Sequence, residues 1–422
     1  KTHLIAHSPY LIKGWSVAQQ FEILSLISEI QKGASSPSHA RYLDDVARRL
    51  VSRMASSDQR LVLDRGAEWP GAALGAIAKL PKQPTPETFS MLRALDGKLA
   101  KDEGDAADRL RVGIAAVIAR SGNKEGLAYL RELFESEPER RGILAVALAQ
   151  HPNNDNWPLL VRSLTVLEDD IASAVMAKML SADQTSADPH VIRQLILQGL
   201  KQKQDTGRRL VTTLLEKWTG ELQSEFGETQ IEKIAAWQSW FRETYPDLPD
   251  PVLPKEVDED RYSFSELEQY LETDEALVAK PELGRLVYAQ ANCIKCHRFG
   301  KLGADVGPDL STISKRFQKK ELLESIIFPS HIISDQYATK TVATASGRIL
   351  RGIVNENNDG SIIVIDPEGN RLTVAAADID EIGPNKESTM PAGLLNALSL
   401  EDIANLFAFL SQQPPTIVSQ RP

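Results

Sequence analysis

The chain contains only two cysteines, which lie two residues apart and are followed at once by a histidine, in the segment Cys293-Ile294-Lys295-Cys296-His297. This C-x-x-C-H spacing is typical of covalent haem attachment, in which each thiol forms a thioether with one vinyl group of the macrocycle. The histidine can then give an imidazole nitrogen to the iron. The motif therefore predicts one c-type haem, attached through Cys293 and Cys296, with His297 as an iron ligand.

Three other interpretations of the same residues stay open. A structural zinc site needs four ligands, usually from a second pair at similar spacing, and the chain has no third cysteine. A redox dithiol of the thioredoxin type would lie between a strand and a helix, whereas residues Leu283–Gln290, just upstream, have a helical pattern. The last interpretation is a chance occurrence of the motif in a chain of 422 residues.

Composition narrows the class of protein. Hydrophobic residues make up 42% and charged residues 25% of the chain, as in ordinary globular proteins, and two to three domains are expected at this length. The formal net charge of −10 does not resemble a basic nucleic-acid-binding surface. No apolar run reaches the ~18 residues that a membrane-spanning helix needs.

Because c-type haem is attached outside the cytoplasm, we expect a periplasmic or otherwise exported protein whose targeting segment is missing before Lys1.

Residues 1–245 show one helical pattern after another. Apolar residues recur at intervals of three and four, and turn-forming residues separate the groups, which are Phe21–Ile30, Leu127–Leu133, Leu160–Leu167 and Ile192–Leu200. Helices opening near Asn123, Asn156 and Asp188, at spacings of 33 and 32 residues, each precede a partner helix opening near Glu139, Asp170 and Asp205. This period resembles HEAT-like repeats that stack into an α-solenoid. An irregular helical bundle is the alternative, and the region could serve either as a docking surface or as a spacer.

Residues 246–262 are predicted to be a linker. Four prolines in Pro246–Pro254 stiffen the chain toward an extended conformation, and an acidic run, Glu256–Asp260, follows. A helix over Phe264–Leu271 is then expected to lead into the haem-carrying domain.

From Pro281 onward the order of motifs resembles a class I cytochrome c. Residues Leu283–Tyr288 are similar to the first helix of that family, in which Gly284 would allow close contact with the last helix, Leu400–Leu410. The resemblance implies that Tyr288 contributes to haem binding. Gly307-Pro308-Asp309-Leu310 is similar to the family's G-P-x-L loop, in which the carbonyl of Pro308 accepts a hydrogen bond from the proximal imidazole.

The same resemblance extends to the other side of the haem. A short apolar helix over Lys320–Ile327 would place Leu322 and Leu323 as walls of the haem pocket. Thr389-Met390-Pro391-Ala392 is similar to the family's axial methionine loop, so that Met390 is the implied sixth ligand. His331 is the competing sixth ligand, but it lies in a loop and is expected to be exposed.

Met390 lies 93 residues after His297, which is too far for a minimal cytochrome c, and the excess has a strand pattern. Glycine-containing turns separate five short strands, which are predicted at Tyr337–Ala345, Arg348–Val354, Ile362–Ile365, Leu372–Ala375 and Ile379–Ile382. They predict a small SH3-like β-barrel over residues 338–383, inserted into a cytochrome domain formed by residues 263–337 and 384–422. With the segment Pro329–Tyr337, the arrangement resembles the haem-binding domain of planctomycete-type multidomain dehydrogenases.

The predicted fold is therefore multidomain: an all-α HEAT-like domain over residues 1–245, followed by an α-helical class I cytochrome c with a β insert. The predicted function is electron transfer by a haem with His297 and Met390 as axial ligands. The resemblance implies a dehydrogenase as electron donor and a cytochrome or oxidase as acceptor. No catalytic residues are predicted. Two alternatives stay open: a haem enzyme with a labile methionine ligand that binds peroxide or another small molecule, and a structural adaptor.

Overall fold

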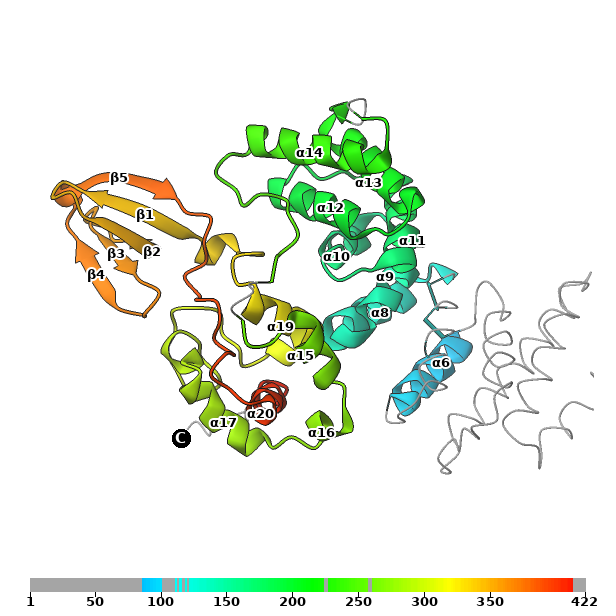
Figure 1. The fold of residues 1–422 in the computed structure, drawn as a ribbon. Helices are drawn as coiled ribbons and strands as arrows, with labels where there is room; N and C mark the ends of the chain where they lie inside the picture. The colour runs from blue at the N-terminus through cyan, green and yellow to red at the C-terminus, as the bar shows by residue number, and fades with distance from the viewer. Residues whose placement is uncertain are drawn as a thin grey trace, which may run out of the picture. The chain divides into compact units, whose positions relative to one another are not determined.

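The computed structural model of the chain describes residues 86–100, 111, 114, 115, 118, 119, 121–223, 227–256 and 260–412. These residues form 14 α-helices and one five-stranded antiparallel sheet (Figure 1). The helix predicted at Phe21–Ile30 lies outside the described residues. The chain divides into two compact units, one formed by Lys1–Phe134, Arg140–Ser163 and Ala177–Gln184, and the other by Glu135–Glu139, Leu164–Met176 and Thr185–Pro422.

The predicted helix pairs are confirmed as helices. In chain order, the described helices before residue 245 are α6 (Pro86–Leu99), α8 (Lys124–Ser136), α9 (Arg141–Leu148), α10 (Trp157–Ser163), α11 (Asp169–Leu180), α12 (Pro189–Lys201), α13 (Asp205–Thr219) and α14 (Gln230–Thr244). Capping explains two of the starts: the side chain of Asn123 accepts from the N–H of Glu125 at 2.8 Å, and that of Asp188 accepts from the N–H of His190 at 2.9 Å. Stacking of these pairs into a HEAT-like solenoid stays a prediction.

A buried carboxylate that the sequence does not predict organises the first unit. Asp96 on α6 is 1% exposed and accepts a hydrogen bond from the hydroxyl of Tyr129 on α8 at 2.8 Å. Its carboxylate also faces the guanidinium groups of Arg111, at 3.2 Å, and Arg140, at 3.4 Å. One acidic side chain therefore connects α6, α8 and the start of α9 inside an otherwise apolar core.

Replacing Asp96 with alanine is expected to destabilise this unit by about 3 kcal/mol, because the buried Arg111 and the half-buried Arg140 lose their carboxylate partner. The measurement is urea unfolding of the full chain, followed by far-ultraviolet circular dichroism. Asp155→Ala is the matched control, since Asp155 pairs with Arg131 at 3.6 Å but its side chain is 77% exposed, and exposed pairs contribute less than about 1 kcal/mol. Equal losses in the two variants would contradict the assignment.

The second unit contains the remaining helices. They are α15 (Phe264–Tyr270), α16 (Asp274–Leu277), α17 (Pro281–Gln290), α18 (Ile313–Arg316), α19 (Lys319–Ile327) and α20 (Leu400–Leu410). The four predicted at Phe264–Leu271, Leu283–Tyr288, Lys320–Ile327 and Leu400–Leu410 are confirmed within a few residues, and the two four-residue helices, α16 and α18, are not predicted by the sequence analysis. Helices α17 and α20 cross at Gly284, where a Cβ atom would overlap the backbone carbonyl of Asn405 and lie 2.7 Å from the Cβ of Phe409. Only glycine permits this approach, so the predicted reason for Gly284 is confirmed.

The β insert forms an open sheet. Its strands are β1 (Thr339–Thr344), β2 (Ile349–Glu356), β3 (Ile362–Ile365), β4 (Arg371–Val374) and β5 (Ile379–Pro384), in the order β4-β3-β2-β1-β5. The five predicted strands are confirmed, but β4 and β5 remain edges of the sheet. The predicted closure into an SH3-like barrel is therefore not found in this sheet. One face buries a small apolar core made of Val342, Ile362, Val364 and Val374.

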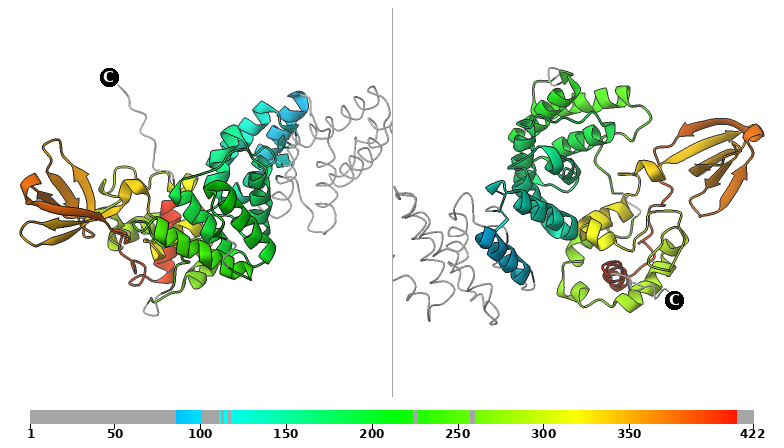
Figure 2. Two further views of the ribbon diagram at one scale, coloured as in Figure 1. Left: turned by 90° about the horizontal axis from the view of Figure 1, so that it is seen from above. Right: turned by 180° about the vertical axis from the view of Figure 1, so that it is seen from behind.

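The sheet is joined to its unit by two neighbouring chain segments, one before β1 and one after β5 (Figures 1 and 2). These segments touch, since the N–H of Asn385 donates to the carbonyl of Thr339 at 2.9 Å. The register of β1 with β5 continues the contact, with Lys340 opposite Pro384. An insertion whose two ends meet in this way can enter an existing loop with little disturbance of the helices around it.

The proline-rich segment predicted as a linker is fastened to the second unit. Arg193 on α12, which is 5% exposed, donates from Nε to the carbonyl of Pro249 at 2.8 Å and from Nη2 to that of Asp250 at 3.0 Å. Burial lowers the pKa of Arg193 to about 10, although the charge of Asp250 opposes this shift. Gln238 on α14 donates to the carbonyl of Pro251 at 2.7 Å, and Lys386 pairs with the carboxylate of Asp250 at 3.0 Å. Among the described residues, no helix is both long and apolar enough to cross a bilayer.

Candidate functional site

The two cysteines follow directly from the end of α17. Asn292 adopts a left-handed conformation with φ of 62°, which asparagine tolerates better than most residues, and thereby ends the helix. Residues Cys293–Lys295 then form one 3₁₀ turn, and the N–H of His297 donates to the carbonyl of Cys293 at 2.9 Å. Both cysteines are half-buried, and neither is in a disulfide, so both thiols are free for thioether formation.

The thiols do not have the properties of a redox dithiol. Burial raises the pKa of the Cys293 thiol to about 11. Burial also raises the pKa of Cys296, with the charge of Lys295 opposing and that of Asp366 adding to the shift. A thioredoxin-type pair needs a lowered pKa, and it lies between a strand and a helix, whereas this pair follows a helix. The zinc alternative also lacks support, because no group of three or more metal-binding side chains is found within the described ranges.

His297 is held by the loop that carries Pro308. Its Nδ1 lies 2.8 Å from the carbonyl oxygen of Pro308, so the Nδ1–H donates to that carbonyl and Nε2 is left for a metal. Burial lowers the pKa of His297, and the hydrogen bond to Pro308 partly opposes this shift. A Cβ at Gly307 would lie 2.8 Å from the imidazole Cε1. The sequence prediction that pairs His297 with Pro308 is thus met by the geometry.

Tyr288 binds the backbone of the same histidine. Its buried hydroxyl donates to the backbone carbonyl of His297 at 2.7 Å. The ring packs against Phe409 of α20, with a centroid distance of 5.5 Å, and Phe409 packs against Phe299 at 4.4 Å. Burial raises the pKa of Tyr288 far above its usual value. Tyr288 was predicted to bind the cofactor, and the structure places its hydroxyl on the backbone of the haem motif.

An ionic cluster next to the histidine is not predicted by the sequence analysis. Arg298 donates to the carboxylate of Asp309 at 2.6 Å, and the N–H of Ser311 donates to the other carboxylate oxygen at 2.8 Å. The hydrogen bonds from Ser311 and Arg298 lower the pKa of Asp309 to about 2. The sequence contains one indication of this cluster: Arg298 directly follows His297, and Asp309 directly follows Pro308. The cluster fastens the Pro308 loop to the haem motif.

Apolar side chains border the motif, and some of them are fully buried while others are half-buried. Leu323 on α19 is completely buried in the core of this region, whereas Leu322, its neighbour, is half-buried at the edge. Further half-buried apolar residues border the same core, namely Ile294, Leu302, Leu310, Phe317, Ile326 and Ile327. The site thus has two free thiols, an imidazole whose Nε2 is left for a metal, and a partly exposed apolar border. These features fit a covalently bound haem.

The other predicted axial ligand lies in the segment between β5 and α20. Met390 is half-buried, and its N–H donates to the hydroxyl of Ser388 at 3.1 Å. Beyond Met390, the side chain of Asn396 donates to Asp260 at 2.8 Å and accepts from the N–H of Arg261 at 3.1 Å. These contacts fix the chain after Met390. The ligation of iron by His297 and Met390 stays a prediction.

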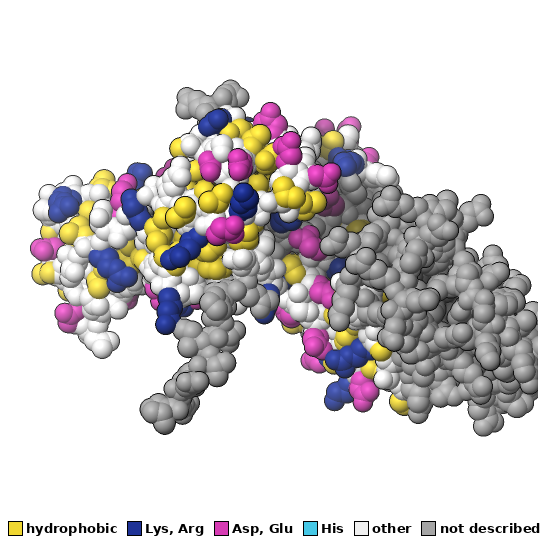
Figure 3. Space-filling view, turned by 90° about the horizontal axis from the view of Figure 1, so that it is seen from below, with side chains coloured by type: hydrophobic (Ala, Val, Ile, Leu, Met, Phe, Trp, Pro, Cys, Tyr) yellow, Lys and Arg dark blue, Asp and Glu magenta, His cyan; other side chains and the backbone are white. Residues whose placement is uncertain are grey.

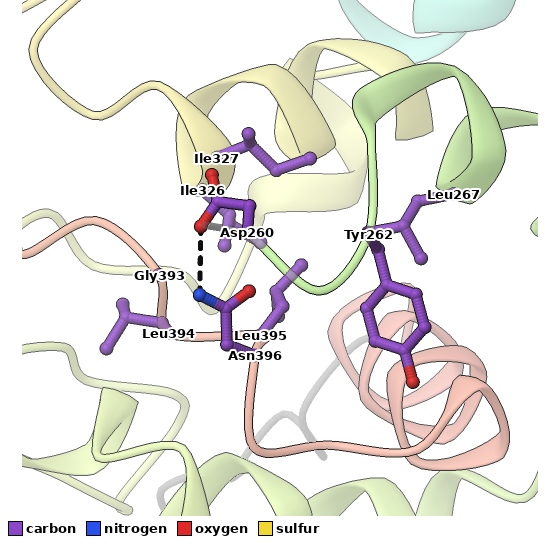
Figure 4. A pocket seen from close by; sticks show the side chains of 9 residues that line it. All are labelled: Asp260, Tyr262, Leu267, Ile326, Ile327, Gly393, Leu394, Leu395 and Asn396. Atoms are coloured by element: carbon purple, nitrogen blue, oxygen red, sulfur yellow. Dashed lines mark hydrogen bonds between the residues drawn. The ribbon is translucent and has the colours of Figure 1, made fainter. Parts of the chain in front are cut away.

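A pocket beside this segment is shown in Figure 4. The Asp260–Asn396 hydrogen bond crosses it, and Leu267, Ile326 and Leu395 lie around it. The lining includes neither cysteine and does not include His297. The pocket therefore lies at the hydrogen bond that fixes the chain after Met390, and no side chain of the haem motif lines it.

His331 is not exposed, and that prediction is wrong. The residue is 8% exposed, and its Nε2 lies 3.6 Å from a carboxylate oxygen of Glu324. Burial lowers its pKa to about 4, with further contributions from the positive charges of Arg193 and Lys201 on α12. The surroundings of His331 thus come from α12 and α19.

Comparison with known protein families agrees with the geometry in this part of the chain. Residues 281–348 match the family model of cytochrome c. The match includes α17, both cysteines, His297 and Pro308, and it ends before Met390. No curated protein sequence matches the chain. The chain therefore contains a cytochrome c domain, of the family that binds haem covalently and uses it to transfer electrons.

Proposed function

We propose that the chain transfers electrons through one c-type haem, from a partner dehydrogenase to a respiratory acceptor such as a cytochrome or an oxidase. The observation that carries the proposal is the geometry at residues 293–308, where two free cysteines precede an imidazole whose Nδ1 is fixed by Pro308. One haem is proposed because the chain has one pair of cysteines.

Each residue of the site has a proposed role. Cys293 and Cys296 attach the haem, and the Pro308 carbonyl orients His297 so that Nε2 holds the iron. Met390 is the sixth ligand, and Tyr288, Leu322 and Leu323 shape the pocket. The bound haem supplies a one-electron ferric/ferrous couple. A soft thioether ligand favours the ferrous state and raises the reduction potential.

Two surfaces are candidates for partner docking. The helix pairs of residues 124–219 are proposed to stack as HEAT-like repeats and to present a docking face. Figure 3 looks onto the face that carries α16 and α17, and it shows hydrophobic side chains gathered there. Leu277, Val278 and Leu286 are 65%, 76% and 67% exposed. Exposed apolar residues that cluster in this way are typical of protein contact sites.

The finer classification is also part of the proposal. We place the domain with the haem-binding domains of planctomycete-type dehydrogenases, in which a small β domain of SH3-like type interrupts the cytochrome. Its support is the order of motifs along the chain and the five-stranded insert between α19 and α20. An exported or periplasmic location follows from where c-type haem is attached.

The test uses the full chain matured with haem. We expect reversible one-electron reduction and reoxidation, no binding of carbon monoxide to the ferrous protein, and no turnover of peroxide, because both axial positions are filled. Rapid carbon monoxide binding together with peroxide turnover would favour the haem-enzyme alternative. A haem that no partner protein reduces or oxidises would favour a structural adaptor.

A further inference from the structure

The residue before Met390 makes a buried contact with the inserted sheet. The hydroxyl of Thr389 lies 2.8 Å from the hydroxyl of Thr339, the first residue of β1. Thr389 is 6% exposed and Thr339 is 4% exposed. A hydrogen bond between two side chains so far from water is costly to break, because each hydroxyl loses its partner in a place that solvent does not reach.

Neighbouring contacts restrain the same segment. The carbonyl of Thr339 accepts from the N–H of Asn385 at 2.9 Å, so both ends of residues 385–389 meet one residue of β1. The N–H of Ser388 donates to the hydroxyl of Ser330 at 3.0 Å. The path of the chain into Met390 is therefore set by β1 and by the segment that leads into β1.

The sheet also approaches the haem motif at a second place. In the turn between β3 and β4, a Cβ at Gly369, where φ is +83°, would lie 3.6 Å from the carbonyl oxygen of Lys295. Ile353 and Ile365 face each other across β2 and β3 and are 9% and 2% exposed, although neither belongs to the sheet's own apolar core. The insert thus lies beside the segment that attaches the haem and contacts the segment that carries Met390.

We propose that the inserted sheet holds the sixth ligand of the haem in place, with Thr339 and Thr389 as positioning residues for Met390. The inference rests on the proposed His297/Met390 ligation. The insert would then position the sixth ligand, because removing the insert would remove β1, to which the segment before Met390 is hydrogen-bonded.

The experiment compares variants of the full, haem-loaded chain by imidazole titration of the ferric form. Thr389→Val and Thr339→Val keep the side-chain shape but remove a hydroxyl. Each is expected to bind imidazole about tenfold more tightly than the wild type, because a loosened methionine competes less well for the iron. The red charge-transfer band of methionine–iron ligation should weaken in both. Thr389→Ser restores the hydroxyl and should behave as the wild type does.

The matched control is Thr341→Val, on the same strand but opposite Arg351 and Gly383. Its imidazole affinity should stay within about twofold of the wild type. Unchanged imidazole affinity in the Thr389 and Thr339 variants, with the methionine band present in the wild type, would overturn the inference but leave the His297/Met390 ligation standing. Equal changes in Thr341→Val would also overturn it, since a general loss of sheet stability would then be the cause. A wild type without the band would overturn both the ligation and the inference.

Discussion

Replacing both Cys293 and Cys296 with alanine is expected to give a protein from which acidified acetone extracts all of the haem. The thioethers need both thiols, and the chain contains no other cysteine. Cys293→Ala alone should leave at most one covalent link, and the wild type should retain its haem through the extraction. The measurement is the haem absorbance that remains with the precipitated protein.

His297 and its support by Pro308 and Tyr288 are intact in the double variant, so any haem that it holds is bound by coordination and packing alone. Extraction of all haem from the wild type would show that the c-type assignment is wrong. Retention of covalent haem by the double variant would show that attachment uses another residue.

Replacing Met390 with alanine is expected to open the iron to carbon monoxide and to lower its reduction potential. The thioether sulfur stabilises the ferrous state, and its loss removes that preference. Of the five methionines, the other four, Met54, Met91, Met176 and Met179, precede the proline-rich segment, and Met176 and Met179 are completely buried. The measurements are a redox titration and the ferrous–carbon monoxide spectrum.

His331→Ala is the control for this variant, and it should keep the red charge-transfer band of methionine ligation. The control is needed because the low pKa of His331 keeps its imidazole neutral at pH 7, which is the form that binds metals. A wild type that lacks the band, or an unchanged spectrum in Met390→Ala, would show that Met390 is not the sixth ligand.

Local signals in the sequence predicted much of the fold. Helix starts near Asn123 and Asp188 are marked by capping side chains, and β3 coincides with its predicted range because an apolar run is bounded by turns. Gly284 was predicted from the need for a close helix crossing. The haem motif and the Pro308 loop were predicted because they lie close together in the chain, with His297 and Pro308 only 11 positions apart.

The contacts that could not be predicted join residues far apart in the chain. Thr339 and Thr389 are separated by 50 positions and Asp96 and Arg140 by 44, and neither spacing has a pattern that sequence periodicity reveals. The burial of His331 depends on α12 and α19 together, so its loop position gave the wrong expectation. The order of the strands in the sheet could not be predicted for the same reason. Five strand patterns along the chain do not indicate that β5 pairs with β1 and not with β4.

A cytochrome domain on a flexible proline-rich linker would sample a large volume. Its effective concentration relative to a donor on the same chain would depend on the length and stiffness of that linker. The anchoring of residues 249–251 by Arg193 and Gln238, and the pairing of Asp250 with Lys386, remove that freedom. The haem motif and helices α12–α14 belong to one compact unit. The proline-rich segment therefore does not act as a free tether between α14 and the haem motif.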